Sequence, residues 1–365
     1  MRSIPATQGD NFVIGFEGTA MTPAVEALLK RVQPAGVILF QRNIVDAVQT
    51  WELLRACQRC VAKPLFTCVD MEGGRVDRLH ELFGPSPSAA SVFATGDARL
   101  FALHGKWIGA VCGAVGFNVN FAPTLDLALP PSLRVMSSRV VSPKPADVAR
   151  YALAFLRGLA ESHVLGCGKH FPGLGEVCLD THKDLPVVDK PLKRLLAEDA
   201  EPYRVIRRAL PFVMVSHTIY SAADKDRPAS LSKKWMTEIL RKKLGYTGLV
   251  ITDDMEMGAL QKAAPIEEAS VLALRGGADL LLICHSEDQI LRAHAAVARK
   301  VESDRRFAAS VRQSAARVTR SKRKFAKRLA ASPRPSPAKV EKLSRALWEF
   351  GEQVRLGALA GEKAS

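Results

Sequence analysis

The chain has 365 residues and a formal net charge of +15, and its composition is 47% hydrophobic and 24% charged. These hydrophobic and charged fractions are ordinary for a globular protein, and they exclude a mainly disordered chain, a collagen-like chain and a small disulfide-stapled domain. At roughly 100–200 residues per domain, the length allows two domains or one large α/β domain. The charge is the unusual quantity, because a strongly basic chain can indicate an acidic partner such as nucleic acid or an anionic membrane.

Most of the excess charge lies in one segment near the C-terminus. Residues 291–330 hold 13 Lys and Arg against two Asp and Glu, so they carry +11 of the +15. The remainder of the chain is therefore close to balanced. Such a charge run is usually a solvated helix face, and we expect it to lie outside the functional site, with no nucleic acid as partner. The alternative is a binding protein that uses residues 305–328 to contact nucleic acid or an anionic surface.

The sequence at the N-terminus and the cysteine pattern bear on the compartment. Residues 1–10 are polar and lack the apolar core of a signal peptide, and no run of about 18 apolar residues predicts a membrane span. Seven cysteines are scattered without a disulfide framework, which suits a reducing cytosol. We therefore expect a cytoplasmic protein, with a monomer favoured, although the sequence does not give the oligomeric state.

Apolar runs of strand length alternate with amphipathic segments along the chain. The eight runs lie at 12–16, 36–40, 65–70, 117–127, 164–171, 212–220, 248–254 and 279–285. Each run is nearly continuous, which is typical of strands covered on both faces. Helical spacing of apolar residues predicts helices over 146–162, 192–209, 232–244 and 287–304.

Eight strand–helix units in about 300 residues favour a (β/α)₈ TIM-like barrel. A doubly wound sheet is the competing architecture, but no G-x-G-x-x-G follows the first run. After residue 304 the chain predicts a long basic helix over 307–329, a proline-rich linker and an amphipathic helix over 339–356. We expect a barrel domain over 1–304 and a basic C-terminal helical extension over 305–365, packed on or beside the barrel or used for self-association.

Polar residues gather where the apolar runs end. They are Asp70, Asp126, Lys169, His170, Ser216, His217, Asp253, Asp254 and His285. The carboxyl ends of the strands of a barrel converge on one face, and active sites lie there. The placement therefore predicts an active site at the mouth of the barrel.

Three motifs carry these polar residues. Residues 70–78 read Asp-Met-Glu-Gly-Gly-Arg-Val-Asp-Arg, and their carboxylates and arginines can bind a polyhydroxy ligand, or form a salt bridge within a loop. Residues 169–182 begin with Lys-His, continue through a Pro-Gly-x-Gly loop and end with Asp-Thr-His, so a carboxylate can orient a histidine that acts as general acid/base. A metal site built from His170, Glu176, Asp180 and His182 is the alternative for this motif, although the compact spacing that zinc prefers is absent.

The third motif is Thr252-Asp-Asp-Met255, at the end of an apolar run. Because side chains alternate along a strand, one carboxylate can point into the barrel mouth as a nucleophile or base while the other is held in the wall. Asp254 can also serve as the N-cap of a following helix, and the two roles are compatible.

Taken together, these motifs resemble glycoside hydrolase family 3, and within it the single-domain bacterial β-N-acetylglucosaminidases of the NagZ type. That family typically reads D-Q-E-G-G-R-V, K-H-F-P-G-H-G, D-S-H and S-D-D in this order, and the resemblance covers about residues 10–300. This chain departs from the pattern at four positions, which are Met71, Leu174, Thr181 and Thr252. The family fold is also a (β/α)₈ barrel.

The resemblance implies the roles of the site residues. Asp253 would be the nucleophile, His182 the general acid/base and Asp180 its partner. The N-acetylglucosamine ring would be bound by Asp70, Arg78, Lys169 and His170, and by Arg139, whose match to the family pattern is looser.

The activity implied is that of a retaining glycosidase that needs no cofactor and no metal. Its small-molecule substrate would be a carbohydrate, a cytosolic peptidoglycan fragment in which N-acetylglucosamine is linked to 1,6-anhydro-N-acetylmuramic acid, with or without peptide. A β-glucosidase, or a phosphorylase in which phosphate replaces water, is the alternative activity for the same fold.

Overall fold

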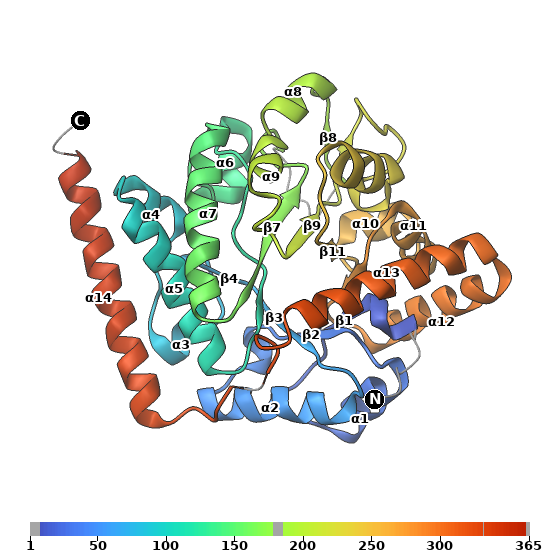
Figure 1. Ribbon diagram of the computed structural model, residues 1–365, viewed down its shortest axis with the longest axis horizontal. Coiled ribbons are helices and arrows are strands. Elements are labelled where there is room, and N and C mark those ends of the chain that lie inside the picture. The colour runs from blue at the N-terminus through green and yellow to red at the C-terminus, as the bar shows by residue number, and fades with distance from the viewer. Residues whose placement is uncertain (1–7, 178–184, 331, 363–365) are drawn as a thin grey trace.

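The computed structural model describes residues 8–177, 185–330 and 332–362. Eight parallel strands close into a barrel in the order β1-β12-β11-β9-β7-β6-β3-β2, and helices surround it (Figure 1). The strands are β1 (Phe12–Ile14), β2 (Gly36–Ile38), β3 (Phe66–Val69), β6 (Val119–Asn120), β7 (Leu165–Phe171), β9 (Phe212–Val215), β11 (Leu249–Asp254) and β12 (Leu280–Ile283). Every strand falls within one of the eight predicted runs, so the predicted (β/α)₈ barrel is confirmed.

The helices around the barrel follow the strands in chain order. They are α1 (Pro23–Val32), α2 (Ala47–Cys60), α5 (Ala98–Ala114), α7 (Pro145–Glu161), α8 (Leu192–Ala197), α9 (Glu201–Ile206), the π-helix η5 (Lys234–Lys243), α11 (Ile266–Gly276) and α12 (Glu287–Ser303). Short helices lie in the loops: α3 (His80–Phe83), α4 (Ala89–Ala94), α6 (Pro130–Met136), α10 (Gly258–Ala263), η1 (Gln8–Asn11), η2 (Gln41–Asn43), η3 (Ser137–Arg139) and η4 (Ala229–Leu231). Two small sheets pair β4 (Met71–Gly73) with β5 (Val76–Asp77), and β8 (Val187–Val188) with β10 (Ile219–Tyr220).

The single helix predicted over 192–209 is wrong, because the structure has two helices there. Pro202 is the second residue of α9. Proline has no N–H to donate, and inside a helix its ring clashes with the carbonyl four residues earlier, which here belongs to Glu198. Glu198 is the C-cap of α8, so the chain breaks at the residue that the proline excludes from a continuous helix.

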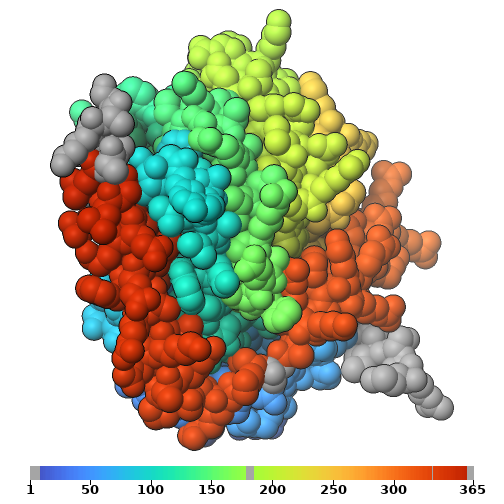
Figure 2. All heavy atoms as spheres, turned by 60° about the vertical axis from the view of Figure 1, so that its left-hand side comes forward, coloured from blue at the N-terminus to red at the C-terminus, as the bar shows by residue number. Residues whose placement is uncertain are grey.

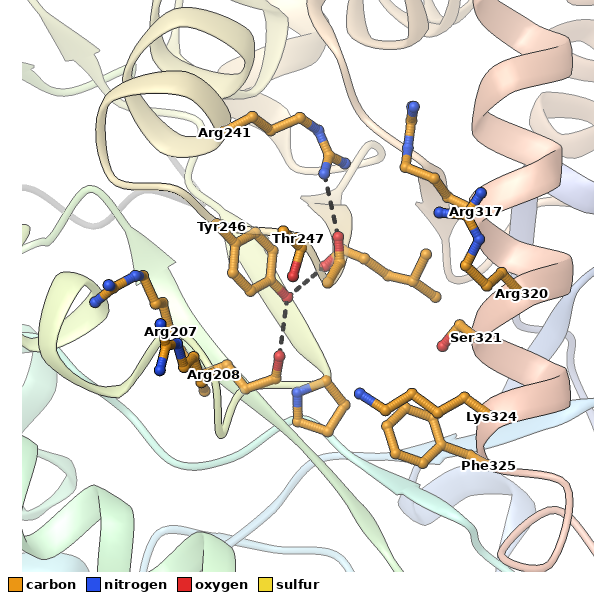
Figure 3. A pocket seen from close by; sticks show the side chains of 14 residues that line it. Arg207, Arg208, Arg241, Tyr246, Thr247, Arg317, Arg320, Ser321, Lys324 and Phe325 are labelled. Carbon is orange, nitrogen blue, oxygen red and sulfur yellow. Dashed lines mark hydrogen bonds between the residues drawn. The ribbon is translucent and has the colours of Figure 1, made fainter.

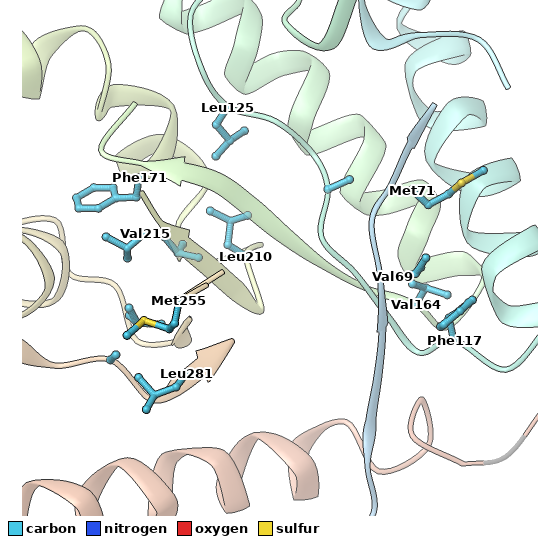
Figure 4. Close-up of a cluster of buried hydrophobic side chains, with 14 of the residues drawn as sticks. Val69, Met71, Phe117, Leu125, Val164, Phe171, Leu210, Val215, Met255 and Leu281 are labelled. Carbon is cyan, nitrogen blue, oxygen red and sulfur yellow. The ribbon is translucent and has the colours of Figure 1, made fainter. Parts of the chain in front are cut away.

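Two hydrophobic layers hold the barrel together. Because side chains alternate along each strand, Val13 points into the barrel while Phe12 and Ile14 pack outward against helices. The interior is filled by residues that include Phe66, Phe121, Phe212 and Ile251. Figure 4 shows part of the outer layer, in which Val69, Phe171 and Val215 face the surrounding helices. The barrel is therefore a packed core and not a channel.

The C-terminal helices pack closely on the barrel. Helix α13 (Arg305–Lys324) contacts η1, α11, α12 and β11, and its Val318 belongs to the interior cluster of the barrel. Nζ of Lys322 donates to the carbonyl of Ala35 at 2.8 Å, and burial lowers the pKa of this lysine to about 7. Helix α13 thus covers the end of the barrel at which the strands begin.

Helix α14 (Pro337–Glu362) lies along the side of the barrel over α3, α4 and α5, as Figure 2 shows in red beside cyan. Leu343, Leu347 and Phe350 are its buried residues on that side. The boundary that the sequence suggests between residues 304 and 305 stays a prediction. Across the described residues, no helix has the length and apolarity that a membrane crossing requires.

Candidate active site

A pocket of about 380 Å³ opens where the strands of the barrel end. The residues that line it come from strand ends all around the barrel: Phe40, Asp70, Lys169, His170, Met214, Asp253, Asp254, Leu282, Cys284 and His285. The loops after β3 and β6 and the start of the loop after β7 complete it with Glu72, Arg75, Val76, Arg78, Val135, Met136, Arg139 and Leu174, and Met257 after β11 joins them. The fold therefore brings polar residues at the strand ends together in one pocket, as their positions at the ends of the apolar runs predict.

A tight turn in the first motif places Glu72 at this mouth. Gly73 and Gly74 both have positive φ, and a Cβ at Gly73 would lie 2.2 Å from the carbonyl oxygen of Pro87. Only glycine fits such a turn without strain. The turn lets β4 pair back on β5, which brings Glu72 and Arg78 to the same pocket.

Glu72 is the hub of a buried ion cluster. Its carboxylate accepts two parallel hydrogen bonds from Arg139, at 2.9 and 2.8 Å, and pairs with Nζ of Lys169 at 2.7 Å. Burial alone would raise the pKa of Glu72, but the charges of Arg139 and Lys169 outweigh it, so that the pKa lies well below its usual value. Glu72 is therefore ionised at neutral pH although it is only 4% exposed.

Lys169 links this cluster to Asp70. Its Nζ lies 2.7 Å from Oδ1 of Asp70, so one buried ammonium bridges two carboxylates. Burial alone would lower the pKa of Lys169, but Asp70 and Glu72 overcome that effect and raise the pKa above its usual value. Lys169 stays charged, and Asp70, which is more exposed than Glu72, can turn its other oxygen toward a ligand.

His170 is held by a second carboxylate. Its Nδ1 lies 2.7 Å from Oδ2 of Asp126, and Oδ1 of Asp126 accepts the backbone N–H groups of His170 and Leu174. Asp126 therefore fixes both the imidazole and the start of the loop that follows β7. With Nδ1 occupied, Nε2 is the ring nitrogen of His170 that is available to a ligand.

Asp253 lies at the end of β11, close to two histidines. Burial alone would raise the pKa of Asp253, but His170 and His217, with the backbone N–H of Asp254 at 2.9 Å, lower it below its usual value. His217 is itself fixed by Ser230 at 2.6 Å and by the carbonyl of Asp254 at 2.9 Å. Asp253 is thus a rigidly supported carboxylate, ionised and lining the pocket, which are the properties that a nucleophile needs.

Asp254 also lines the pocket, and it is not the helix cap that the sequence suggested. Helix α10 begins only at Gly258, with Met257 as its N-cap. Asp254 instead accepts the N–H of Glu256 at 3.1 Å and pairs with His285 at 3.4 Å. The hydrogen bond to Asp254 raises the pKa of His285. The helix starts later because the chain makes a tight turn at residues 255–257 before it can wind.

The two predicted arginines differ in their partners. Arg139 donates to Glu72 through Nε and Nη2, and its Nη1 lies 3.7 Å from Sδ of Met136. Arg78 has no ion pair within the described ranges, and its buried Nε–H has no acceptor there. Of the two, Arg78 is the one that lines the pocket without an ion pair within the described ranges.

The predicted acid/base pair, Asp180 and His182, lies outside the described residues. The segments that flank it are tied together by Lys190, which is 1% exposed and pairs with Asp199 at 2.6 Å and with Glu176 at 3.1 Å. Burial raises the pKa of Asp199 to about 6. Both ends of the segment that carries the two residues are therefore anchored to the barrel.

The alternative metal site gains no support from its described members. His170 is bound to Asp126 and Glu176 to Lys190, so the two side chains have different partners. Over residues 8–177, 185–330 and 332–362, no three His, Cys, Asp or Glu side chains are arranged to hold a metal ion.

The sequence analysis missed two residues that organise the site. Glu72 lies inside the first motif, but an acid that precedes two glycines is interpreted as a loop residue until its two buried cations are seen. His217 stands among the strand-end residues, yet its contact with Asp254, at the end of the neighbouring strand, depends on tertiary structure. The only sequence signal for Glu72 was that it is ionisable and stands two positions after the end of an apolar run.

The chain matches known proteins over most of its length. Residues 10–321 match the model of the glycosyl hydrolase family 3 N terminal domain. It is 35% identical over 277 residues to a β-hexosaminidase of Idiomarina loihiensis, covering 75% of this chain and 83% of that protein. It is 34% identical over 288 residues to a β-hexosaminidase of Haemophilus influenzae, with coverages of 77% and 81%.

Solved structures show the same similarity. A glycoside hydrolase family 3 β-N-acetylglucosaminidase from Paenibacillus superposes with a TM-score of 0.88 at 31% identity, over 95% of this chain and 69% of that chain. Native NagZ from Neisseria gonorrhoeae superposes with a TM-score of 0.78 at 25% identity, over 96% of this chain and 99% of that chain.

The ion cluster yields a stability prediction. Glu72→Gln keeps the side-chain volume but leaves two buried cations without their shared carboxylate. Breaking a buried pair from one side costs about 3 kcal/mol, so the free energy of unfolding in urea should fall by about that amount. Glu52→Gln is the matched control, because Glu52 pairs with Arg334 in an exposed ion pair, which is worth less than about 1 kcal/mol. Equal losses in the two variants would show that Glu72 is not the hub.

Proposed function

Because this chain belongs to glycoside hydrolase family 3 and is a β-N-acetylhexosaminidase, we propose that it removes terminal β-linked N-acetylglucosamine from cytosolic peptidoglycan fragments by a retaining mechanism. The observation that carries the proposal is Asp253, an ionised carboxylate at the end of β11 that lines the pocket beside His170. A retaining glycosidase needs such a carboxylate as its nucleophile.

In the first step, a carboxylate oxygen of Asp253 attacks the anomeric carbon of the N-acetylglucosamine. The bond to the leaving oxygen breaks as His182 transfers a proton to that oxygen, and a glycosyl ester forms on Asp253. Asp180 is the partner of His182 in this proposal, because a neighbouring carboxylate favours the charged form of an imidazole. A histidine acid differs from the usual second carboxylate, and it titrates near neutral pH without being buried.

In the second step, His182 accepts a proton from water, and the resulting hydroxide attacks the anomeric carbon. The ester bond to Asp253 breaks, the carboxylate is regenerated and the sugar leaves with its original β configuration. The supports around Asp253 are relevant to both steps, because a nucleophile held by His217 and by the N–H of Asp254 needs little reorganisation.

The sugar-binding roles follow from the contacts at the mouth. Asp70 accepts hydrogen bonds from ring hydroxyls, while Lys169 and His170 donate or accept at neighbouring hydroxyls. Arg139 presents its guanidinium to the ring. Arg78, which has no ion pair within the described ranges, supplies a positive charge that suits an anionic fragment such as one that carries a muramic acid carboxylate.

The proposal also covers the cofactor requirement, the compartment and the oligomeric state. The residues in named roles accomplish the reaction without a cofactor or metal, and no nucleic acid takes part. A cytoplasmic location is supported by cysteine chemistry, because the six cysteines in the described ranges are all free. We propose that the chain acts as a monomer.

The nucleophile assignment is tested by Asp253→Asn. Removing the attacking carboxylate should lower kcat/KM for an aryl N-acetyl-β-glucosaminide by at least about a thousand-fold, which is roughly 4 kcal/mol of transition-state stabilisation. Release of nitrophenol is the measurement. Asp288→Asn, which changes an exposed carboxylate on α12, should keep wild-type activity. An Asp253→Asn enzyme within tenfold of wild type would make the assignment wrong.

The acid/base assignment is tested by His182→Ala on two leaving groups. General acid catalysis contributes about 10²–10⁴-fold, and a poor leaving group depends on it more than a good one. We expect a large loss of glycosylation rate for an alkyl glycoside and a small loss for a dinitrophenyl glycoside. His163→Asn, on the opposite end of the barrel, should leave both rates unchanged. A loss of the same size for both substrates would contradict a role as proton donor.

The substrate proposal is tested with a sugar panel. Aryl N-acetyl-β-glucosaminide should be cleaved with a kcat/KM at least about a hundred-fold above that of aryl β-glucoside, because a site built to bind the acetamide rejects the sugar that lacks it. The N-acetylglucosaminyl-anhydromuramic acid disaccharide should release free N-acetylglucosamine, with or without added phosphate. Preference for the glucoside, or formation of a glycosyl phosphate, would instead favour the alternative activities.

A further inference from the structure

A second pocket, of about 480 Å³, lies at the end of the barrel opposite the carbohydrate pocket. It is bounded by Pro211 before β9, by Gly248 and Leu249 at the start of β11, and by one face of α13 (Figure 3). Strand β11 carries Asp253 near its other end, about 13 Å away at the rise of an extended strand. The two pockets are therefore separate sites on one strand.

The lining of this basal pocket is strongly basic. It includes six cationic side chains, Arg207, Arg208, Arg241, Arg317, Arg320 and Lys324, and no Asp or Glu. Arg241 and Arg317 share the carboxylate of Asp279, which is fully buried behind them. The other four cations have no carboxylate partner within the described part of the chain. Six cations therefore face one carboxylate, and the pocket carries about five uncompensated positive charges.

These cations converge from two walls, which distinguishes the pocket from a solvated helix face. Arg317, Arg320 and Lys324 recur at helical spacing on α13. Figure 3 shows them across the cavity from Arg207 and Arg208, which directly follow α9. Like charges gathered around a concavity repel one another, and their mutual repulsion is relieved when an anion binds between them. The hydroxyls of Ser321 and Thr247 add neutral donors at the rim.

We propose that the basal pocket binds a triphosphate chain. Such a chain carries roughly four negative charges at neutral pH, which the excess positive charge of the lining can balance. Guanidinium groups bind phosphate oxygens through paired N–H donors, and three of the four unpaired cations are arginines. The cavity volume falls within the range of small-ligand sites, about 300–1,000 Å³. Inorganic triphosphate and a nucleoside triphosphate share this chemistry, and the proposal goes beyond the glycosidase activity and does not depend on it.

The test is calorimetric titration of the full chain with inorganic tripolyphosphate in metal-free buffer. Arg208→Ala combined with Arg320→Ala removes one unpaired cation from each wall. It should weaken binding at least about tenfold, because charge-assisted hydrogen bonds to phosphate are stronger than neutral ones. Arg305→Ala combined with Arg306→Ala is the matched control, because both arginines are exposed on α13 outside the pocket and the change in net charge is the same. The control should bind as the wild type does. Arg320→Glu gives a second variant at an exposed position and should bind more weakly than the wild type.

Two further titrations identify the source of the phosphate chain. ATP that binds more tightly than tripolyphosphate, with the same loss in the pocket variant, would indicate a nucleoside triphosphate, and equal affinities would indicate that the phosphate chain alone is recognised. No binding of tripolyphosphate at millimolar concentration would overturn the proposal. An equal loss in the pocket variant and the control would also overturn it. A third result would also overturn the proposal: a single-stranded oligonucleotide binds more tightly than tripolyphosphate and loses the same affinity in both variants. The ligand would then be a polyanion held along the whole basic helix.

Discussion

The buried carboxylate of Glu72 is the constraint on which the mouth of the barrel depends. An ionised acid with 4% exposure is costly unless cations and hydrogen bonds surround it. Arg139 and Lys169 supply these cations to Glu72 from two different segments of the chain, and Lys169 also pairs with Asp70. Removing Glu72 would leave both cations without their shared partner, so the ligand-facing groups of three chain segments share one electrostatic anchor. The site is preorganised because its charges are satisfied before a substrate arrives.

A closed parallel barrel has two chemically distinct ends, and this chain uses both. The carboxyl ends of the strands bring acids, histidines and Lys169 together in a nearly balanced pocket. The amino ends are covered by α13, whose buried face enters the barrel interior at Val318 while its other side holds cations. The excess charge of the sequence is thus concentrated at the end of the barrel opposite Asp253.

The sequence was sufficient for features that depend on local pattern, and insufficient for those that depend on packing. Eight continuous apolar runs predict eight buried strands. The polar residues at the ends of six of these runs predict the mouth, because strand direction alone determines at which end of the barrel they lie. Pro202 indicates a break between two helices at Glu198, but the helical spacing of apolar residues over 192–209 led to the prediction of one continuous helix. The delayed start of α10 at Gly258 and the contact between His217 and Asp254 have no local signature, since they arise from how β9 and β11 lie side by side. Likewise, the cations of α13 read as a solvated face until Arg207 and Arg208 are placed across from them.

Leu174 shows why a departure from a family pattern need not alter the site. This residue stands where the family usually has histidine, and its side chain is buried at the wall of the carbohydrate pocket. The contact that positions the loop here is made by its backbone N–H, which donates to Asp126 at 2.8 Å. Any residue can supply that N–H, so Asp126 still fixes both the loop and the imidazole of His170. The substitution therefore exchanges a polar wall for an apolar one while leaving the supports of His170 in place.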